Sequence, residues 1–238
     1  TSLIIGFFFV VAFVVDSLRN IVIGNIFENA AAAIVLALWV VAIAFIQNPA
    51  NDIATTVVDS QELILYANLY FFSWLTFLVA VYIVALNFRD NFQFGPKFSQ
   101  WVLLFTASIV LMCTAVNVRG EICGNDGVEE VCSRTKYAVG VGAVGMVISF
   151  LAVVLSVFDK MTRFVELGST ILSSILYFFG VVFLTSTGGP ASSMGNMYFS
   201  VWGGCVVSFV LMVGNFLPSV RMGDESEQGT PGRDEEHL

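Results

Sequence analysis

The amino-acid sequence predicts an all-α membrane protein, a helical bundle that crosses the bilayer about seven times. Of its 238 residues, 57% are hydrophobic and only 12% are charged, whereas an average soluble domain carries about 25% charged residues. The apolar residues gather into runs that approach or exceed the ~17 residues a helix needs to cross a bilayer. The net charge of −8 with ten basic residues leaves no basic patch, which excludes a nucleic-acid-binding protein.

Short polar segments divide the chain into seven predicted spans. These are Ser2–Val15, Ala30–Ile46, Ile64–Leu86, Trp101–Val116, Ala138–Phe158, Thr170–Leu184 and Phe199–Leu217. The first is short, and because the chain begins with Thr1 we expect it to be incomplete through truncation or processing. A cleaved signal peptide is the alternative for this run, although it lacks a basic segment and an Ala-x-Ala cleavage site.

The basic residues predict the orientation, because cytoplasmic loops carry an excess of Lys and Arg. With seven spans, the loops alternate between two faces of the membrane. One face carries Arg19, Arg89, Lys97, Lys160, Arg163, Arg221 and Arg233, and the other carries only Arg119, Arg134 and Lys136. We therefore expect a cytoplasmic C-terminus, in a protein of the plasma membrane or an endomembrane.

Two cysteines lie in the loop that carries the three minority charges. Eight residues separate Cys123 from Cys132, and the turn-forming sequence Gly-Asn-Asp-Gly follows Cys123. Paired cysteines in a short polar loop form a disulfide where the compartment is oxidising, so this loop is expected outside the cytoplasm. Two free thiols or a metal pair are the alternatives, but neither a His nor a third Cys is nearby to complete a metal site.

The composition changes abruptly after Leu217. Pro218 ends the last span, and residues 223–238 carry six acidic residues against the single basic residue Arg233. Such a stretch cannot bury enough apolar surface to fold, so residues 218–238 are expected to be a disordered acidic tail in the cytoplasm. Its terminal Glu-His-Leu could bind a carboxylate-capturing groove of a cytoplasmic partner. A plain solvated tail is the favoured interpretation.

Two spans open with one pattern, Asn-x-Tyr-Phe-x-x-Trp, which begins at Asn68 and again at Asn196. Spans one to three therefore resemble spans five to seven, and because an even number of spans separates the copies, they are predicted to form a parallel repeat. The chain then divides into a first membrane repeat at residues 1–98, a second at residues 99–217, and the tail.

Two interpretations compete for the polar and aromatic motif residues, which are Asn68, Tyr70, Trp74, Asn196, Tyr198 and Trp202. As anchors, the Tyr and Trp of each copy share one helical face at the headgroup level, and each Asn caps its helix. As a functional site, the two copies face each other and form a binding site or a pore mouth. The anchoring interpretation is favoured because it needs no ligand.

The fifth span carries a stripe of small residues. Their spacings alternate between four and three, which places them on one helical face: Ala138, Gly142, Gly145, Ser149, Ala152 and Ser156. Lipid provides no hydrophobic drive for helix association, so close approach of small residues must supply the contacts. The stripe is predicted to form the central contact of the bundle, with near-parallel, left-handed crossing.

Catalytic chemistry is not indicated anywhere in the sequence. No Asp, Glu, Lys or Arg lies in the middle of a span, where such residues mark proton relays and ion pathways. The only histidine is His237 in the tail, so no span offers a His ligand for a haem or a catalytic metal. The sequence predicts no enzyme activity, no catalytic residue, no cofactor and no metal site.

Spans four to seven form a four-helix unit whose first loop carries Cys123-x8-Cys132, followed by Arg134 and a glycine-rich helix. Over roughly residues 100–217 this resembles the tetraspan plan of MARVEL-type and claudin-like membrane proteins. The loop is shorter than a claudin loop, and Ile122 stands where claudins have a Trp before the first Cys. The resemblance implies an architecture more than a function.

We predict a non-enzymatic organising protein or auxiliary subunit that lies in the lipid bilayer and associates laterally with other membrane proteins or with itself. A channel, facilitator or transporter is the alternative, with its path between the two repeats near Asn68 and Asn196. A polar cavity beside these residues would favour transport, whereas a dry, tightly packed bundle would favour association.

Overall fold

The computed structural model describes residues 26–58, 61–123, 129–192 and 195–216. Six helices in these segments are long and apolar enough to cross a membrane. They are α3 (Ile26–Ile46), α4 (Ala67–Phe92), α5 (Phe98–Ile122), α6 (Glu129–Val157), α7 (Arg163–Thr185) and α8 (Asn196–Phe216). The predicted helical membrane architecture is confirmed. The predicted first span, Ser2–Val15, and the predicted tail, 218–238, lie outside the described residues.

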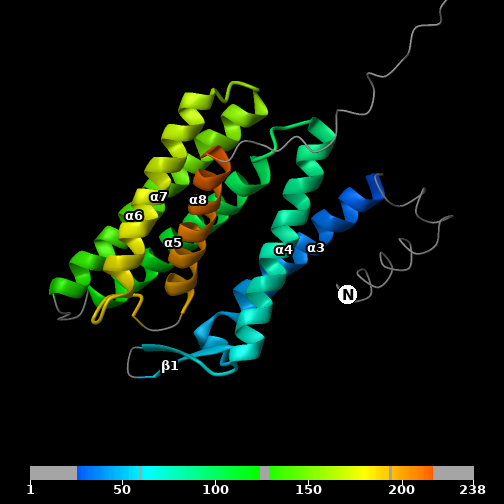
Figure 1. Ribbon diagram of the computed structural model, residues 1–238. Helices are drawn as coiled ribbons and strands as arrows, with labels where there is room; N and C mark the ends of the chain where they lie inside the picture. Colours follow the sequence, from blue (N-terminus) through cyan, green and yellow to red (C-terminus); the bar gives the residue numbers. More distant parts are fainter. Residues whose placement is uncertain (1–25, 59–60, 124–128, 193–194, 217–238) are drawn as a thin grey trace, which may run out of the picture.

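Helices α5 to α8 form a closed four-helix bundle, at the left in Figure 1. Each of them packs against the next along the chain, and α8 returns to contact α5. The largest fully buried side chains of the bundle are Trp101, Leu104, Leu111, Tyr177, Leu184 and Leu211. These large side chains fill the centre, so the bundle has a packed interior.

The small-residue stripe of the fifth span lies inside this bundle. Ala138, Gly142, Gly145, Ser149 and Ala152 are buried, and Ser156 is partly buried. A methyl group on Gly142 would come within 2.7 Å of the backbone nitrogen of Met112 in α5. One on Gly145 would come within 2.7 Å of the Tyr177 hydroxyl group in α7. Because these positions lack larger side chains, α6 packs closely against α5 and against the Tyr177 ring.

Helices α3 and α4 form a separate hairpin beside the bundle, at the right in Figure 1. They pack together through Ile43, Phe77 and Val81, and α4 also contacts α5. The connection between them holds a 3-10 turn (Pro49–Asn51) and two antiparallel strands, β1 (Thr55–Val58) and β2 (Gln61–Ile64). The predicted start of the third span at Ile64 is wrong, because Ile64 pairs with Thr55 in extended conformation and α4 begins only at Ala67.

A disulfide joins the end of α5 to the first turns of α6. Cys123 and Cys132 are paired as the sequence predicted, with 5.4 Å between their Cα atoms. Helix α6 begins at Glu129, ahead of the predicted span start at Ala138. Glu129 and Glu130 lie in its first turn, where negative charge is favourable because of the helix dipole. We call this the disulfide end of the molecule.

A polar network holds the bundle together at the opposite end. Lys97 Nζ, just before α5, lies 2.9 Å from Glu166 Oε1 of α7 and donates a hydrogen bond to Asn215 Oδ1 of α8. The amide nitrogen of Asn215 donates in turn to Thr170 Oγ1 of α7 at 3.2 Å. Three helices are therefore fixed to one another beyond the apolar core.

Candidate functional site

The two copies of the aromatic motif meet at the disulfide end, between the hairpin and the bundle. Asn196, the first residue of α8, accepts hydrogen bonds at Oδ1 from the Tyr70 hydroxyl group (2.9 Å) and from the Trp74 indole nitrogen (3.1 Å). Tyr70 and Trp74 are four residues apart on α4, so both reach the same acceptor. The asparagine of one copy is thus held by the aromatic pair of the other.

The remaining motif residues lie apart from this contact. Asn68 is exposed in the first turn of α4, and the predicted cap at this position is wrong, because Tyr66 occupies the N-cap without a side-chain hydrogen bond. The extended chain of β2 delays the start of the helix and places Asn68 inside it. Tyr198 and Trp202 of α8 form a ring pair, with 6.3 Å between their centroids.

Hydrogen bonds connect the first turns of α4 to Gln47, just after the end of α3. Gln47 Nε2 donates to Ser73 Oγ at 2.8 Å, and Ser73 Oγ donates to the Tyr70 carbonyl oxygen at 2.8 Å. Tyr70 and Ser73 are buried, as is Gln47. This chain of hydrogen bonds fixes the first turns of α4, so the aromatic pair is presented to Asn196 from a rigid base.

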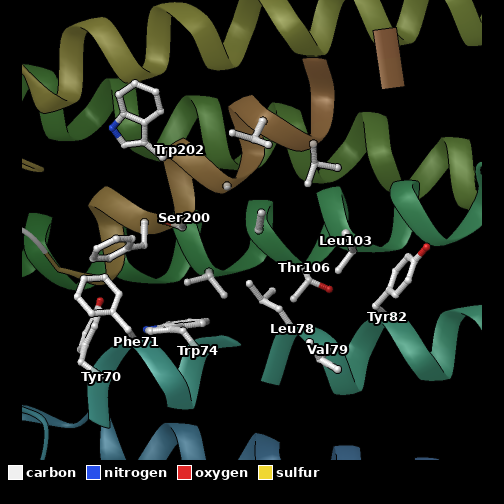
Figure 2. Close-up of a pocket in the computed structure, with 16 residues that line it drawn as sticks. Tyr70, Phe71, Trp74, Leu78, Val79, Tyr82, Leu103, Thr106, Ser200 and Trp202 are labelled. Atoms are coloured by element: carbon white, nitrogen blue, oxygen red, sulfur yellow. The ribbon is translucent and has the colours of Figure 1, made fainter. Parts of the chain in front are cut away.

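A groove of about 600 Å³ extends from this contact along α4, α5 and α8. Tyr70, Phe71 and Trp74 stand at one end of it and Tyr82 at the other, with Trp202 on the facing helix (Figure 2). The remaining lining residues are Leu78 and Val79 of α4, Leu103, Thr106, Ala107 and Val110 of α5, and Phe199, Ser200, Gly203, Val206 and Val207 of α8. The groove therefore separates the hairpin from the bundle.

The lining of the groove is almost entirely hydrocarbon and carries no charged side chain. Thr106 Oγ1 donates to the Val102 carbonyl oxygen at 2.9 Å, and Ser200 Oγ donates to the Met197 carbonyl oxygen at 3.0 Å. These hydroxyl groups are thereby satisfied by their own helices. Such a surface can bind apolar groups by dispersion and area burial, but it gives an ion or a polar solute few partners.

Several groove residues were not among the predicted site residues. Phe71 and Phe199 stand at equivalent positions of the two motif copies, and their rings meet edge to face with 5.0 Å between centroids. The shared Phe of the motif was the signal that could have identified them. The α5 residues carry no such signal, because they join the lining only through the tertiary packing of α5 against α4 and α8.

Metal-binding geometry is not found in the part of the chain that the structure describes. No group of three or more His, Cys, Asp or Glu side chains there could hold an ion. Cys113 and Cys205 are free thiols on α5 and α8. The described site is an apolar surface with aromatic residues at both ends.

These features define a class: an integral membrane protein of α-helices in which a helical hairpin packs against a four-helix bundle. Comparison with protein-family models, with curated proteins and with solved structures finds no match to this chain.

Proposed function

We propose that this protein is a non-enzymatic organiser or auxiliary subunit that associates laterally in the membrane through α3. The observation that supports this is the outward face of α3, which carries Ala30, Ala33, Ala37, Val40 and Ala44. All five are exposed, and their spacings of three and four place them on one side of the helix. The four alanines among them let a second helix approach closely within lipid.

The burial of α3 supports the same proposal. Only 6% of its most apolar stretch is buried, against 28% to 33% for the other five helices. The small-residue stripe of α6 is already used inside the bundle, so it offers no external face. Helix α3 is thus the element on which small residues and exposure coincide.

The alternative, a conduit between the two repeats, receives less support. Asn196 is engaged by Tyr70 and Trp74, and the space beside it is lined by apolar side chains. The bundle centre is occupied by large buried side chains and by close contacts at Gly142 and Gly145. A path for a polar solute needs available hydrogen-bonding groups along its length. The groove lining offers few of them, and buried hydroxyl groups of the bundle such as those of Ser108 and Ser149 already donate to carbonyl oxygens of their own helices.

Cysteine cross-linking tests the proposal. In a background of Cys113→Ala and Cys205→Ala, the substitutions Ala33→Cys, Ala37→Cys and Ala44→Cys are oxidised in native membranes and in liposomes of purified protein. We expect a covalent dimer, or a larger adduct with a membrane protein, at these three positions. Val147→Cys on α6, which is 52% exposed, is the matched control and should give little product. Equal or absent cross-linking at both helices would overturn the proposal.

The orientation proposed with this function places the disulfide end outside the cytoplasm and the C-terminus inside it. The bias of basic residues and the paired state of Cys123 and Cys132 support it, because disulfides persist in oxidising compartments. Intact cells or sealed vesicles are reduced and then treated with a membrane-impermeant maleimide. Labelling of Cys123 from outside is the expected result, and labelling only after permeabilisation would contradict it.

The tetraspan comparison and the parallel repeat remain part of this proposal. The cyclic contact of α5 to α8 and a disulfide between its first two helices are what the resemblance to MARVEL-type and claudin-like proteins implies. The hydrogen bonds from Tyr70 and Trp74 of one motif copy to Asn196 of the other are expected if the two copies are an internal repeat that shares an interface. Binding of a cytoplasmic partner by the acidic tail is proposed from the sequence alone, and deletion of residues 223–238 should abolish it.

A further inference from the structure

The groove between the hairpin and the bundle has a chemistry that restricts its occupant. It lies along the membrane-spanning parts of α4, α5 and α8, and no charged residue lines it. The polar atoms of Tyr70, Trp74 and Thr106 are already hydrogen-bonded within the protein. An occupant that comes from the bilayer therefore gains binding free energy mainly by making dispersion contacts.

The dimensions of the groove fit a hydrocarbon chain better than a transmembrane helix. Its wall on α4 runs from Tyr70 to Tyr82, about 18 Å along the helix axis. A volume of about 600 Å³ over that length corresponds to a mean cross-section of about 33 Å². A helix with its side chains is about 10 to 12 Å wide, a section of roughly 80 to 110 Å². A hydrocarbon chain is roughly 4 to 5 Å wide at van der Waals contact distances, so one or two chains match the groove.

The shape of the wall favours a flexible chain over a rigid fused-ring molecule. The Phe71 and Phe199 rings meet at 89°, and the Tyr70 and Phe199 rings meet at 50°. These rings stand at one end of the groove, as Figure 2 shows for Tyr70 and Phe71. Rings at such different angles give an uneven surface, to which a chain with many rotatable bonds can adapt.

We propose that this groove is a binding site for the acyl chain of a membrane phospholipid. Water finds few partners on the lining, and an empty space would forfeit dispersion contacts. The hydrogen bonds from Tyr70 and Trp74 to Asn196 close the groove at the disulfide end and hold its two walls together. None of the lining residues belongs to α3, so this inference is independent of association through α3.

Photolabelling of the full chain tests the site. The purified protein is reconstituted into phosphatidylcholine nanodiscs that contain a small fraction of phosphatidylcholine with a diazirine in the middle of one acyl chain. After irradiation, the labelled peptides are mapped by mass spectrometry. We expect adducts on the lining segments of α4, α5 and α8 to exceed those on the exposed α6 residues Val147 and Phe150 at least fivefold. Both α6 residues are 52% exposed and provide the reference for lipid that merely surrounds the protein.

A matched pair of glycine substitutions shows whether the groove itself is responsible. A Cβ atom on Gly203, which lines the groove, would meet no atom within 4 Å, and the same holds for Gly140 on α6, outside the groove. Gly203→Phe therefore starts from open space at its Cβ atom, and we expect it to place a ring in the groove and reduce its labelling at least fivefold. Gly140→Phe should leave the labelling unchanged. Gly203→Leu serves as a second, smaller filling variant, and formation of the Cys123–Cys132 disulfide reports correct folding.

Each other result contradicts the proposal. Equal labelling of the groove and of α6, or labelling that survives both Gly203 substitutions, would mean that the groove holds no particular lipid. Stronger labelling of the groove by a diazirine sterol than by the phospholipid would assign it to a rigid ring system. Cross-linking of a benzoylphenylalanine at Leu78 to a polypeptide, in native membranes, would mean that a protein covers it.

Discussion

The helices of the four-helix bundle pack more closely against one another than the two helices of the α3–α4 hairpin do. Within residues 98–216 glycines occur on α5, α6, α7 and α8, whereas residues 26–92 contain none. In the bundle, Gly142 and Gly145 bring α6 against α5 and the Tyr177 ring, and the core side chains are fully buried. The hairpin has a small cluster around Ile43, Phe77 and Val81 and leaves most of α3 exposed.

The comparison teaches that glycines at the helix contacts, rather than apolarity, distinguish the closely packed bundle from the hairpin. The helices of both regions are apolar enough to cross a membrane, and lipid tails are as apolar as Leu, so burying Leu gains little by itself. The bundle is closed because glycines permit backbone approach and many dispersion contacts. The hairpin is held to it by α4–α5 contacts and by hydrogen bonds to Asn196, with a groove between them.

The largest effect should come from a substitution that forces the bundle open. In Gly142→Leu the new side chain would meet the backbone of Met112, which cannot move without displacing α5. Overpacking of this kind typically costs about 3 kcal/mol at its upper range. Unfolding by SDS in mixed micelles, followed by circular dichroism, measures the loss. Gly140→Leu, two residues away in open space, is the control, and equal losses for both would refute the role of close approach.

A smaller effect is expected where the hairpin joins the bundle. Asn196→Leu removes the acceptor of the Tyr70 and Trp74 hydrogen bonds, at a cost of about 1 to 2 kcal/mol for the two donors left without it. The distribution of distances between α4 and α8 should become broader, because few other contacts hold these two helices together.

Spin labels measure this separation. They are attached at Leu75→Cys and Val210→Cys in the background without Cys113 and Cys205, and pulsed electron paramagnetic resonance gives the distance distribution. Asn68→Leu is the matched control from the other motif copy, since Asn68 is exposed. An unchanged distribution in the Asn196→Leu protein would mean that the α4–α5 contact alone positions the hairpin.

A single buried hydrogen bond in the bundle should contribute less. Tyr177→Phe removes the hydroxyl group that lies 2.7 Å from Ser108 Oγ but preserves the ring against Gly204 and Gly145. Side-chain hydrogen bonds between membrane helices average about 0.6 kcal/mol, and a loss of this size is expected in the same SDS assay. Tyr82→Phe, at an exposed position in the hairpin, should have no measurable effect. A loss of several kcal/mol for Tyr177→Phe would show that the hydroxyl group, and not the ring packing, organises the core.

The smallest effect is expected at the end opposite the disulfide. Lys97 and Glu166 are 2.9 Å apart, with about a fifth of each side chain exposed. A double-mutant cycle of Lys97→Gln and Glu166→Gln should give a coupling of about 1 kcal/mol or less, and added salt should reduce it. A coupling well above this value would mean that the polar network, and not the glycine contacts, contributes most to the stability of the bundle.

The sequence was informative wherever local chemistry decides the outcome. Long apolar runs predicted the helices α3 to α8, because in lipid every backbone group must be bonded within its own segment. The Cys123–Cys132 pair followed from two thiols in one short loop. The sequence did not determine where each helix begins. The apolar run predicts a span that starts at Ile64, but Ile64 pairs with Thr55 in a strand.

The candidate site was only half visible in the sequence. The repeated motif identified Tyr70, Trp74 and Asn196, but its spacing gave each asparagine a capping role in its own helix. The structure joins the asparagine of one copy to the aromatic pair of the other, 122 and 126 residues away. The α5 wall of the groove has no motif at all, because any apolar side chain of suitable size serves there.

By itself, then, the sequence determined that the chain forms helices long and apolar enough to cross a membrane, and which cysteines pair. These properties depend on apolar length and on neighbouring residues. Only the tertiary structure decided that the glycine face of α6 is used internally while the alanine face of α3 stays exposed, and that an apolar groove separates α4 from α8. In lipid all apolar faces are nearly equivalent in solvation, so their use is settled by which backbones can approach one another most closely.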